Sequence, residues 1–320
     1  MKKAFSLAAA ALVAVAAFSQ PKSDLRPDKT VLLYAESADS LADPVLGRSV
    51  EYAGYTIEED NGLRGPETVT AKGGIGNISE YARMDLYFPE KPNGLMVVVC
   101  PGGGYRYVAT YNEGLYVAEW MREHGVTTCV VKYRMPNLHY TIPLADVQNA
   151  FRYCRDNADA WGVSKIGVMG FSAGGHLAAS AETMYVDEQT RPDFAVLIYP
   201  VISLDRPESS TRKQLAGQEG ETDPDIQAAV IERFSTEKRV TVSTPPTFLA
   251  LCSDDKSVPA SNGIRFFEAL AACGVQREMY IYPTGGHGWG FTTGRFGRDK
   301  IGYCREEFFT ALARFLDNQK

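Results

Sequence analysis

The sequence predicts an α/β fold with a mostly parallel central sheet and helices on both faces. From Ala82 onward, short strand-like apolar runs alternate with amphipathic helical stretches, which is typical of such a sheet. With 320 residues, 45% of them hydrophobic, the chain is long enough to bury a sizeable core. One stretch, residues 166–180, joins a strand-like segment to a helix-like segment through a serine flanked by glycines.

Seven segments are predicted as strands, at residues 82–88, 95–101, 127–133, 165–171, 194–200, 246–252 and 277–283. Helices are expected to begin near Glu113, Pro143, Ser172, Asp225 and Pro259, and a last helix runs from about residue 299 to the C-terminus. Pro143 and Pro259 suit the first turn of a helix, because an amide proton is not needed there.

Two regions interrupt the alternation. Residues 20–81 are polar and rich in turn residues, and we expect an N-terminal arm or edge strands there, with the catalytic domain over 82–320. Within the arm, "GGIG" at 73–76 follows no predicted strand and is interpreted as a turn. Residues 201–245 exceed the usual connection length and are a candidate cap over an active site, the alternative being an ordinary surface excursion.

The N-terminus has the pattern of a secretory signal peptide over residues 1–19. Lys2 and Lys3 precede an apolar run from Ala4 to Phe18, and small residues end the segment at Ser19. The run is shorter than the roughly 20 residues of a membrane-spanning helix, so cleavage is favoured over a retained anchor. We therefore expect an exported protein, periplasmic or extracellular.

Composition narrows the partners further. The formal net charge of −6 provides no basic face for phosphates, so nucleic acid is not an expected partner. The six cysteines lie in strand-like and helix-like segments, which favours buried thiols over a disulfide scaffold. The sequence contains no Cys-x-x-Cys or His-Cys cluster, and neither a metal nor a cofactor is expected.

The serine lies in Gly170-Phe171-Ser172-Ala173-Gly174, a G-x-S-x-G pattern between a strand and a helix. Such a turn lifts the Ser172 Oγ above the sheet as a nucleophile. It also directs the Ala173 amide, at the start of the helix, toward a developing negative charge. The alternative is a glycine-rich turn with a purely structural serine.

A serine nucleophile requires a base, and the chain has four histidines. His124 ends a helix, His139 lies in a loop, and His176 follows the serine within the same helix. His287 stands in "YPTGGHGWGF", a glycine-rich loop just past the last strand, where catalytic groups of sheet folds gather. His287 is therefore the predicted base.

The orienting acid is expected just beyond residues 246–252, where Asp254 and Asp255 are adjacent. The chain order serine, aspartate, histidine is the order of α/β-hydrolases. For the second half of an oxyanion hole, "PGGGY" at 101–105 follows an early strand, and glycine lets the backbone approach a substrate oxygen. A phosphate-binding loop is the competing interpretation, but no Gly-Lys-Ser/Thr follows.

The sequence resembles the α/β-hydrolase superfamily and, within it, secreted bacterial acetyl esterases and acetylxylan esterases with feruloyl-esterase relatives. The resemblance runs from about Ala82 to the C-terminus through "PGGGY", "EGLYVAEW", "KYRMP", "PLADVQNAFRYCRDNADAWG", "IGVMGFSAGGHLAAS", "YPVIS", "STEKRVT", "TPPTFLALCSDDKSVP" and "GGHGWGF". It implies Ser172 as nucleophile, His287 as base and Asp255 as the orienting acid.

The resemblance also implies oxyanion donors from the backbone of Gly103 or Gly104 and of Ala173. Relatives often carry histidine before the glycine run, and Pro101 stands there instead, which leaves open which glycine amide points inward. Three side chains are candidates for contact with substrate: Tyr105, Glu113 and Trp289. Tyr105 and Trp289 are expected to close the acyl pocket beyond two carbons and so to limit the length of the acyl group. Arg134 and Asp146 are interpreted as structural residues that form an ion pair or a cap rather than take part in catalysis.

The function implied is a serine esterase that removes short acyl groups, foremost acetyl, from plant cell-wall polysaccharide such as xylan or its oligosaccharides. A feruloyl esterase is one alternative. A prolyl-oligopeptidase-type peptidase is another, although residues 20–81 are too few for the propeller that such enzymes carry. A catalytically inactive binding protein is the third. The oligomeric state stays open.

Overall fold

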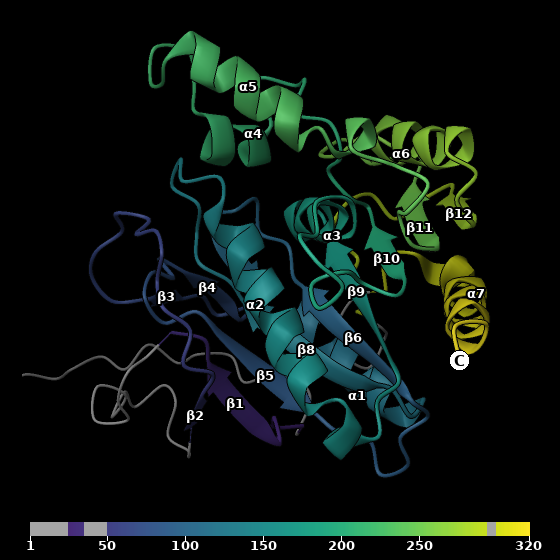
Figure 1. Ribbon diagram of the computed structural model, residues 1–320. Helices are drawn as coiled ribbons and strands as arrows, with labels where there is room; N and C mark the ends of the chain where they lie inside the picture. Colours follow the sequence, from purple (N-terminus) through teal and green to yellow (C-terminus); the bar gives the residue numbers. More distant parts are fainter. Residues whose placement is uncertain (1–24, 35–49, 293–298) are drawn as a thin grey trace, which may run out of the picture.

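The computed structural model describes residues 25–34, 50–292 and 299–320 (Figure 1). The predicted signal peptide lies outside the described residues and stays a prediction. Within these ranges, nine strands form the main sheet, in the order β12-β11-β10-β9-β6-β8-β5-β1-β2. Their bounds are β1 Lys29–Leu32, β2 Val50–Tyr52, β5 Arg83–Tyr87, β6 Leu95–Cys100, β8 Thr127–Lys132, β9 Lys165–Phe171, β10 Ala195–Ile198, β11 Thr247–Cys252 and β12 Arg277–Tyr282.

The sheet is parallel from β8 to β12, whereas β5 runs antiparallel to both of its neighbours. All six residues of β6, "LMVVVC", are buried, as are those of β8 and β11. Strands that are buried on both faces have continuous apolar sequences, and this is why the sequence pattern predicted these three strands. Each of the seven predicted strands is present, and the predicted α/β fold is confirmed.

Helices cover both faces of this sheet. Their bounds are α1 Tyr116–Glu123, α2 Ile142–Asn157, α3 Ala173–Thr183, α4 Ser210–Ala216, α5 Pro224–Phe234, α6 Ser261–Ala272 and α7 Arg305–Asp317. One core cluster joins the sheet to α2, α3 and α6, for example through Phe151, Leu177 and Phe266. A second cluster joins the opposite face to α1 and α7 through Met121 and Phe308.

A small antiparallel sheet corrects one sequence interpretation. "GGIG" is not a turn, because Gly74–Gly76 forms strand β4 between β3 (Thr68–Val69) and β7 (Tyr107–Ala109). Ile75 is buried within it. The pairing with β7 joins segments that are more than thirty positions apart in the sequence, so no local pattern announces it. This sheet brings the N-terminal region beside the "PGGGY" loop.

Residues 201–245 contain α4, α5 and a short 3₁₀ turn, Thr236–Lys238, of which α4 was not predicted. In Figure 1, α4 and α5 stand at the top of the molecule, beyond the end of α2. Asp223 caps α5 by accepting the amides of Asp225 and Ile226, and Pro224 occupies its first turn.

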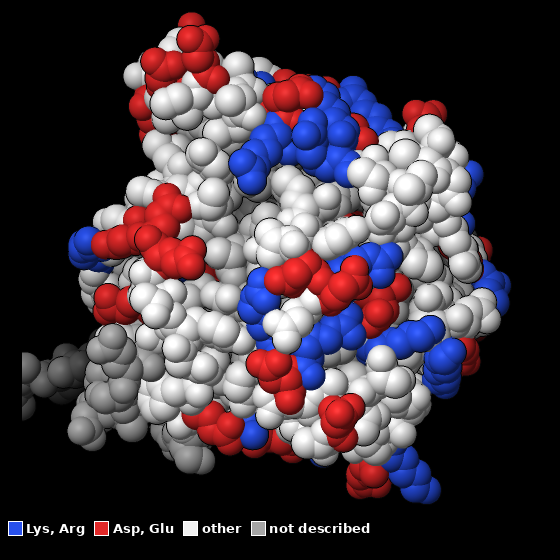
Figure 2. Space-filling model, viewed as in Figure 1, with Lys and Arg blue, Asp and Glu red and all other residues white. Residues whose placement is uncertain are grey.

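The expected ion pair and the expected thiol state of the cysteines are both observed. Arg134 Nη2 lies 2.7 Å from Asp146 Oδ1, and both side chains are buried, which confirms the structural ion pair. All six cysteines are free, five of them buried and Cys273 half-buried. No helix among the described residues is long and apolar enough to span a membrane. Figure 2 shows basic and acidic side chains interspersed on one face rather than gathered into one continuous basic surface.

Candidate active site

Ser172 stands at the turn between β9 and α3 with a strained backbone. Its φ of 56° and ψ of −119° lie outside the regions that L-residues ordinarily adopt. The turn is held on both sides, since the Ser172 amide donates to Ile198 O and its carbonyl accepts from the amides of His176 and Val201. The side chain is thereby directed into an open cleft.

The glycines on either side of Ser172 are required by close backbone contacts. A Cβ on Gly170 would lie 2.1 Å from Gly174 O, and a Cβ on Gly174 would lie 2.1 Å from Cys100 O. These distances are far below van der Waals contact, so neither position accepts a side chain. The turn that carries Ser172 therefore packs closely against α3 and the end of β6.

His287 and Asp255 complete a hydrogen-bonded series with the serine. His287 Nε2 lies 2.8 Å from Ser172 Oγ, and His287 Nδ1 lies 2.6 Å from Asp255 Oδ2. The Asp255 side chain is 1% exposed and that of His287 22% exposed. The other oxygen of Asp255 accepts the amides of Ser257 and Val258, both at 2.9 Å. The carboxylate is thus fixed before any ligand arrives.

The neighbouring carboxylate has a different role. Asp254 is exposed, and its oxygens accept the amides of Gly285 and Gly286 at 3.3 and 2.8 Å. It therefore ties the loop after β11 to the loop that carries His287. Of the two adjacent aspartates, the structure brings only Asp255 to the imidazole.

The "PGGGY" loop faces the same cleft. Gly103 and Gly104 have φ of 135° and 65° and line the cleft beside Ser172. A Cβ on Gly103 would lie 1.9 Å from Tyr107 O, so only glycine fits. Among the described residues, no hydrogen bond uses the amides of Gly103, Gly104 or Ala173, whereas the Gly102 amide donates to Glu113 Oε2 at 2.7 Å. Three unused amides near Ser172 are therefore candidate donors to a substrate oxygen.

Glu113 is buried at the base of the cleft and links three of its loops. Besides accepting the Gly102 amide, its Oε1 accepts the Tyr199 hydroxyl at 2.9 Å. That hydroxyl in turn accepts the Gly290 amide, next to the His287 loop, at 2.8 Å. Burial raises the pKa of the Glu113 carboxyl, although these two hydrogen bonds oppose the shift.

Sequence reasoning missed Tyr199. Its ring centroid lies 4.9 Å from that of His287, and its φ of 38° is unusual for a tyrosine. The residue directly follows β10, at the same sheet edge as Ser172 and Asp255. That position in "LIYP" is the signal that would have found it.

Two of the three predictions of substrate-contacting side chains are wrong. Tyr105 is 1% exposed and lies away from the cleft, because its φ of 57° turns it inward to donate its hydroxyl to His176 Nδ1 at 3.0 Å. Trp289 is also 1% exposed and packs behind His287 against Phe308, with ring centroids 4.9 Å apart. Glu113 does line the cleft.

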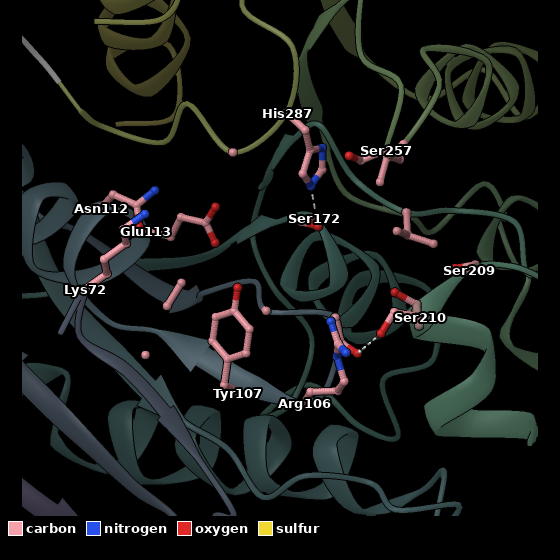
Figure 3. Close-up of a pocket in the computed structure, with 18 of the residues that line it drawn as sticks. Lys72, Arg106, Tyr107, Asn112, Glu113, Ser172, Ser209, Ser210, Ser257 and His287 are labelled. Carbon is pink, nitrogen blue, oxygen red and sulfur yellow. Dashed lines mark hydrogen bonds between the residues drawn. The ribbon is translucent and has the colours of Figure 1, made fainter. Parts of the chain in front are cut away.

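The cleft has a volume of about 940 Å³ and is open to solvent. Figure 3 shows His287 above Ser172, with Lys72 and Asn112 on one side and Arg106 and Ser210 on the other. The candidate cap contributes a wall of small and charged residues: Val201, Arg206, Glu208, Ser209, Ser210 and Thr211. Within the described ranges, no group of three or more His, Cys, Asp or Glu side chains could hold a metal ion.

Comparison with known proteins identifies the fold family. Residues 97–291, a stretch that contains Ser172, Asp255 and the "PGGG" loop and reaches past His287, match the model of a family with the alpha/beta hydrolase fold. The chain belongs to the alpha/beta hydrolase fold family.

Two relatives are similar in sequence to a large part of this alpha/beta hydrolase. An acetylxylan esterase of Xylanibacter ruminicola is 39% identical over 232 residues, which cover 70% of this chain and 47% of the relative. The endo-1,4-beta-xylanase B of Butyrivibrio fibrisolvens is 32% identical over 209 residues, covering 60% of this chain and 32% of the relative. The chain thus spans about half the length of the first and about a third of the second.

Solved structures of alpha/beta hydrolases superpose well. An acetyl ester-xyloside bifunctional hydrolase from Caldicellulosiruptor lactoaceticus is 32% identical with a TM-score of 0.65, covering 74% of this chain and 88% of that one. A thermophilic esterase from Thermogutta terrifontis, 22% identical with a TM-score of 0.59 over 79% of this chain and 93% of that one, shares the fold.

Proposed function

We propose that this alpha/beta hydrolase is a serine esterase that removes short acyl groups, foremost acetyl, from plant cell-wall polysaccharide such as xylan or its oligosaccharides. The observation that carries the proposal is the series Ser172 Oγ, His287 and Asp255, with contacts of 2.8 and 2.6 Å at the wall of an open cleft. A nucleophile, a base and an orienting acid in this arrangement are the groups that acyl transfer needs.

In the proposed mechanism, Asp255 holds the His287 Nδ1–H, which leaves Nε2 free to accept the Ser172 proton. Ser172 Oγ bonds to the ester carbonyl carbon, and the carbonyl oxygen becomes an oxyanion. His287 then returns the proton to the departing alcohol oxygen, and an acyl-enzyme remains. Water, deprotonated by His287, attacks this ester; the carboxylic acid leaves as Oγ regains a proton.

The oxyanion is assigned to the amides of Ala173 and of Gly103 or Gly104. Support comes from their free hydrogen-bonding capacity and from the position of Ala173 at the start of α3, where unpaired N–H groups favour negative charge. Glu113 positions this loop by accepting the preceding Gly102 amide.

The choice of substrate is supported by the relatives named as acetylxylan esterase and acetyl ester-xyloside hydrolase. The signal-peptide pattern of residues 1–19 supports export, and an exported enzyme would encounter polysaccharide outside the cytoplasm. Feruloyl esters are the second candidate substrate.

The test is turnover of a panel of 4-nitrophenyl esters from acetyl to octanoyl, together with acetylated and feruloylated xylan. We expect acetyl esters to be hydrolysed fastest, and Ser172→Ala to lower kcat by roughly 10⁴- to 10⁶-fold in a folded protein. A peptidase would instead cleave prolyl peptides, and a binding protein would turn over none of the esters. Faster hydrolysis of octanoyl than of acetyl esters would contradict the short-acyl assignment.

A further inference from the structure

A second cleft adjoins the one that contains Ser172. It has a volume of about 450 Å³, within the range of clefts that hold small-molecule ligands, about 300–1,000 Å³. Arg106, Glu208 and Ser210 line both clefts, so the two are continuous. The remaining lining residues are Asn137, Leu138, Lys213, Gln214, Gln218 and Glu221.

The second cleft is rich in polar groups that the protein itself leaves unused. Within the described part of the chain, the Arg106 guanidinium, the Lys213 ammonium and the side-chain amides of Gln214 and Gln218 make no hydrogen bond or ion pair. Glu208, by contrast, is paired with Arg206. Free donors and acceptors in a concave surface are available to a bound molecule.

The first cleft adds an aromatic surface. Tyr107 is 40% exposed and lines the first cleft directly after Arg106 in the chain. Figure 3 shows its hydroxyl pointing toward the centre of that cleft, below Ser172. An exposed aromatic ring among polar groups suits a sugar ring, which has an apolar C–H face and a hydroxyl rim.

We propose that the second cleft holds further sugar units of the saccharide chain whose acetyl ester reacts at Ser172. The inference rests on the proposed function. A long acyl chain does not suit this polar lining, because burying its apolar surface there would strip water from unpaired polar groups. A strongly charged ligand does not suit it either, since the lining carries both signs of charge, Arg106 and Lys213 together with Glu208 and Glu221. A neutral, hydroxyl-rich chain matches both properties.

The proposal predicts that chain length on the alcohol side controls the reaction. We expect kcat/KM for acetylated xylotriose to exceed that for mono-acetylated xylose by at least about tenfold, a change that corresponds to 1.4 kcal/mol. The smaller ester cannot reach the second cleft. 4-Nitrophenyl acetate serves as a third substrate that uses only the reacting groups.

The double variant Lys213→Ala/Gln218→Ala removes two of the unused polar groups and leaves Ser172, His287 and Asp255 untouched. We expect it to lower kcat/KM on acetylated xylotriose by about tenfold and to keep that for 4-nitrophenyl acetate within about twofold of the parent protein. Lys91→Ala is the matched control, because Lys91 is exposed just before the amino end of β6, at the opposite end of the sheet from Ser172.

The outcomes separate the two proposals. Equal kcat/KM on the mono- and trisaccharide esters, or an equal loss on all three substrates in the double variant, would overturn the second-cleft assignment alone. No hydrolysis of 4-nitrophenyl acetate or of either sugar ester by the parent protein would overturn the esterase proposal and this inference with it.

Discussion

The inner and outer walls of the cleft are held in opposite ways. The inner wall carries Ser172 and Asp255 at the carboxyl ends of buried parallel strands, and the Asp255 side chain is 1% exposed. The outer wall carries Lys72, Arg106 and Tyr107 on the small sheet and its turns, with Tyr107 40% exposed. The core therefore fixes Ser172 and Asp255, whereas the proposed contacts to the rest of a substrate lie on thin surface elements.

The largest effect is expected at the inner wall, from the two adjacent aspartates. Asp255→Asn should reduce kcat/KM on an acetyl ester by about 10⁴-fold, because the amide no longer enforces the imidazole tautomer that leaves Nε2 free; the figure comes from the same substitution in a serine protease. Asp254→Asn should lose about tenfold or less, since that side chain only accepts two loop amides. The reverse ranking would move the orienting acid to Asp254.

The second prediction concerns Glu113 and its proposed role in positioning the "PGGGY" loop. Glu113→Ala leaves the Gly102 amide and the Tyr199 hydroxyl without their partner, and we expect kcat to fall by roughly 10²- to 10³-fold, as when one oxyanion donor is lost. KM should change much less. Glu113→Gln keeps an acceptor for Gly102 and should recover most of the activity. An equal rise in KM for both variants, with kcat unchanged, would show that Glu113 acts in binding instead.

A third prediction concerns stability at a buried histidine that connects the inner wall to the cap. His176 is fully buried, its Nδ1 accepts the Tyr105 hydroxyl, and its Nε2–H donates to Phe234 O at the end of α5. Burial lowers the pKa of His176 to about 4. The unfolded chain therefore binds a proton that the folded chain excludes, so stability is complete above about pH 6.5 and falls as the pH drops toward 4.

Denaturant unfolding at pH 7 and pH 4.5 measures this loss. The parent protein should lose on the order of 2 to 3 kcal/mol more than His176→Gln between these pH values, because glutamine does not titrate. The carboxylates titrate equally in both proteins, so their contribution to the free energy of unfolding cancels from the difference. Identical pH profiles would show that His176 is not held neutral in the folded state.

The smallest effect is expected at the outer wall. Tyr107→Ala should leave kcat/KM for 4-nitrophenyl acetate within about twofold and lower that for an acetylated xylo-oligosaccharide by about three- to tenfold, since only the latter has a sugar ring to pack on the aromatic face. A change of the same size on both substrates would place Tyr107 with the reacting groups and remove the distinction between the walls.

The sequence predicts the positions of Ser172, Asp255 and His287 well because each lies within a few residues after a strand. The three strands, β9, β11 and β12, end at one sheet edge, and parallel strands bring such ends together. The resemblance implied Asp255 rather than Asp254, and Asp255 is the aspartate that contacts the imidazole.

The remaining parts of the site were predicted poorly, for physical reasons. Position next to a motif does not fix the direction of a side chain, and the left-handed backbone at Tyr105 turns that ring into the core. The β3-β4-β7 sheet depends on pairing between distant segments, which no local pattern reveals. Tyr199 was missed because its hydroxyl acts through Glu113 and Gly290, partners distant in the sequence.

The most direct test of the central claim is covalent labelling of the intact protein with a serine-reactive fluorophosphonate, followed by mass spectrometry of its peptides. We expect one modified residue, Ser172, with labelling that is abolished in Ser172→Ala and strongly slowed in His287→Ala. Hydrolysis of 4-nitrophenyl acetate should be lost in proportion to the labelled fraction. Labelling at another serine, or full hydrolysis by protein labelled at Ser172, would show that Ser172 is not the nucleophile.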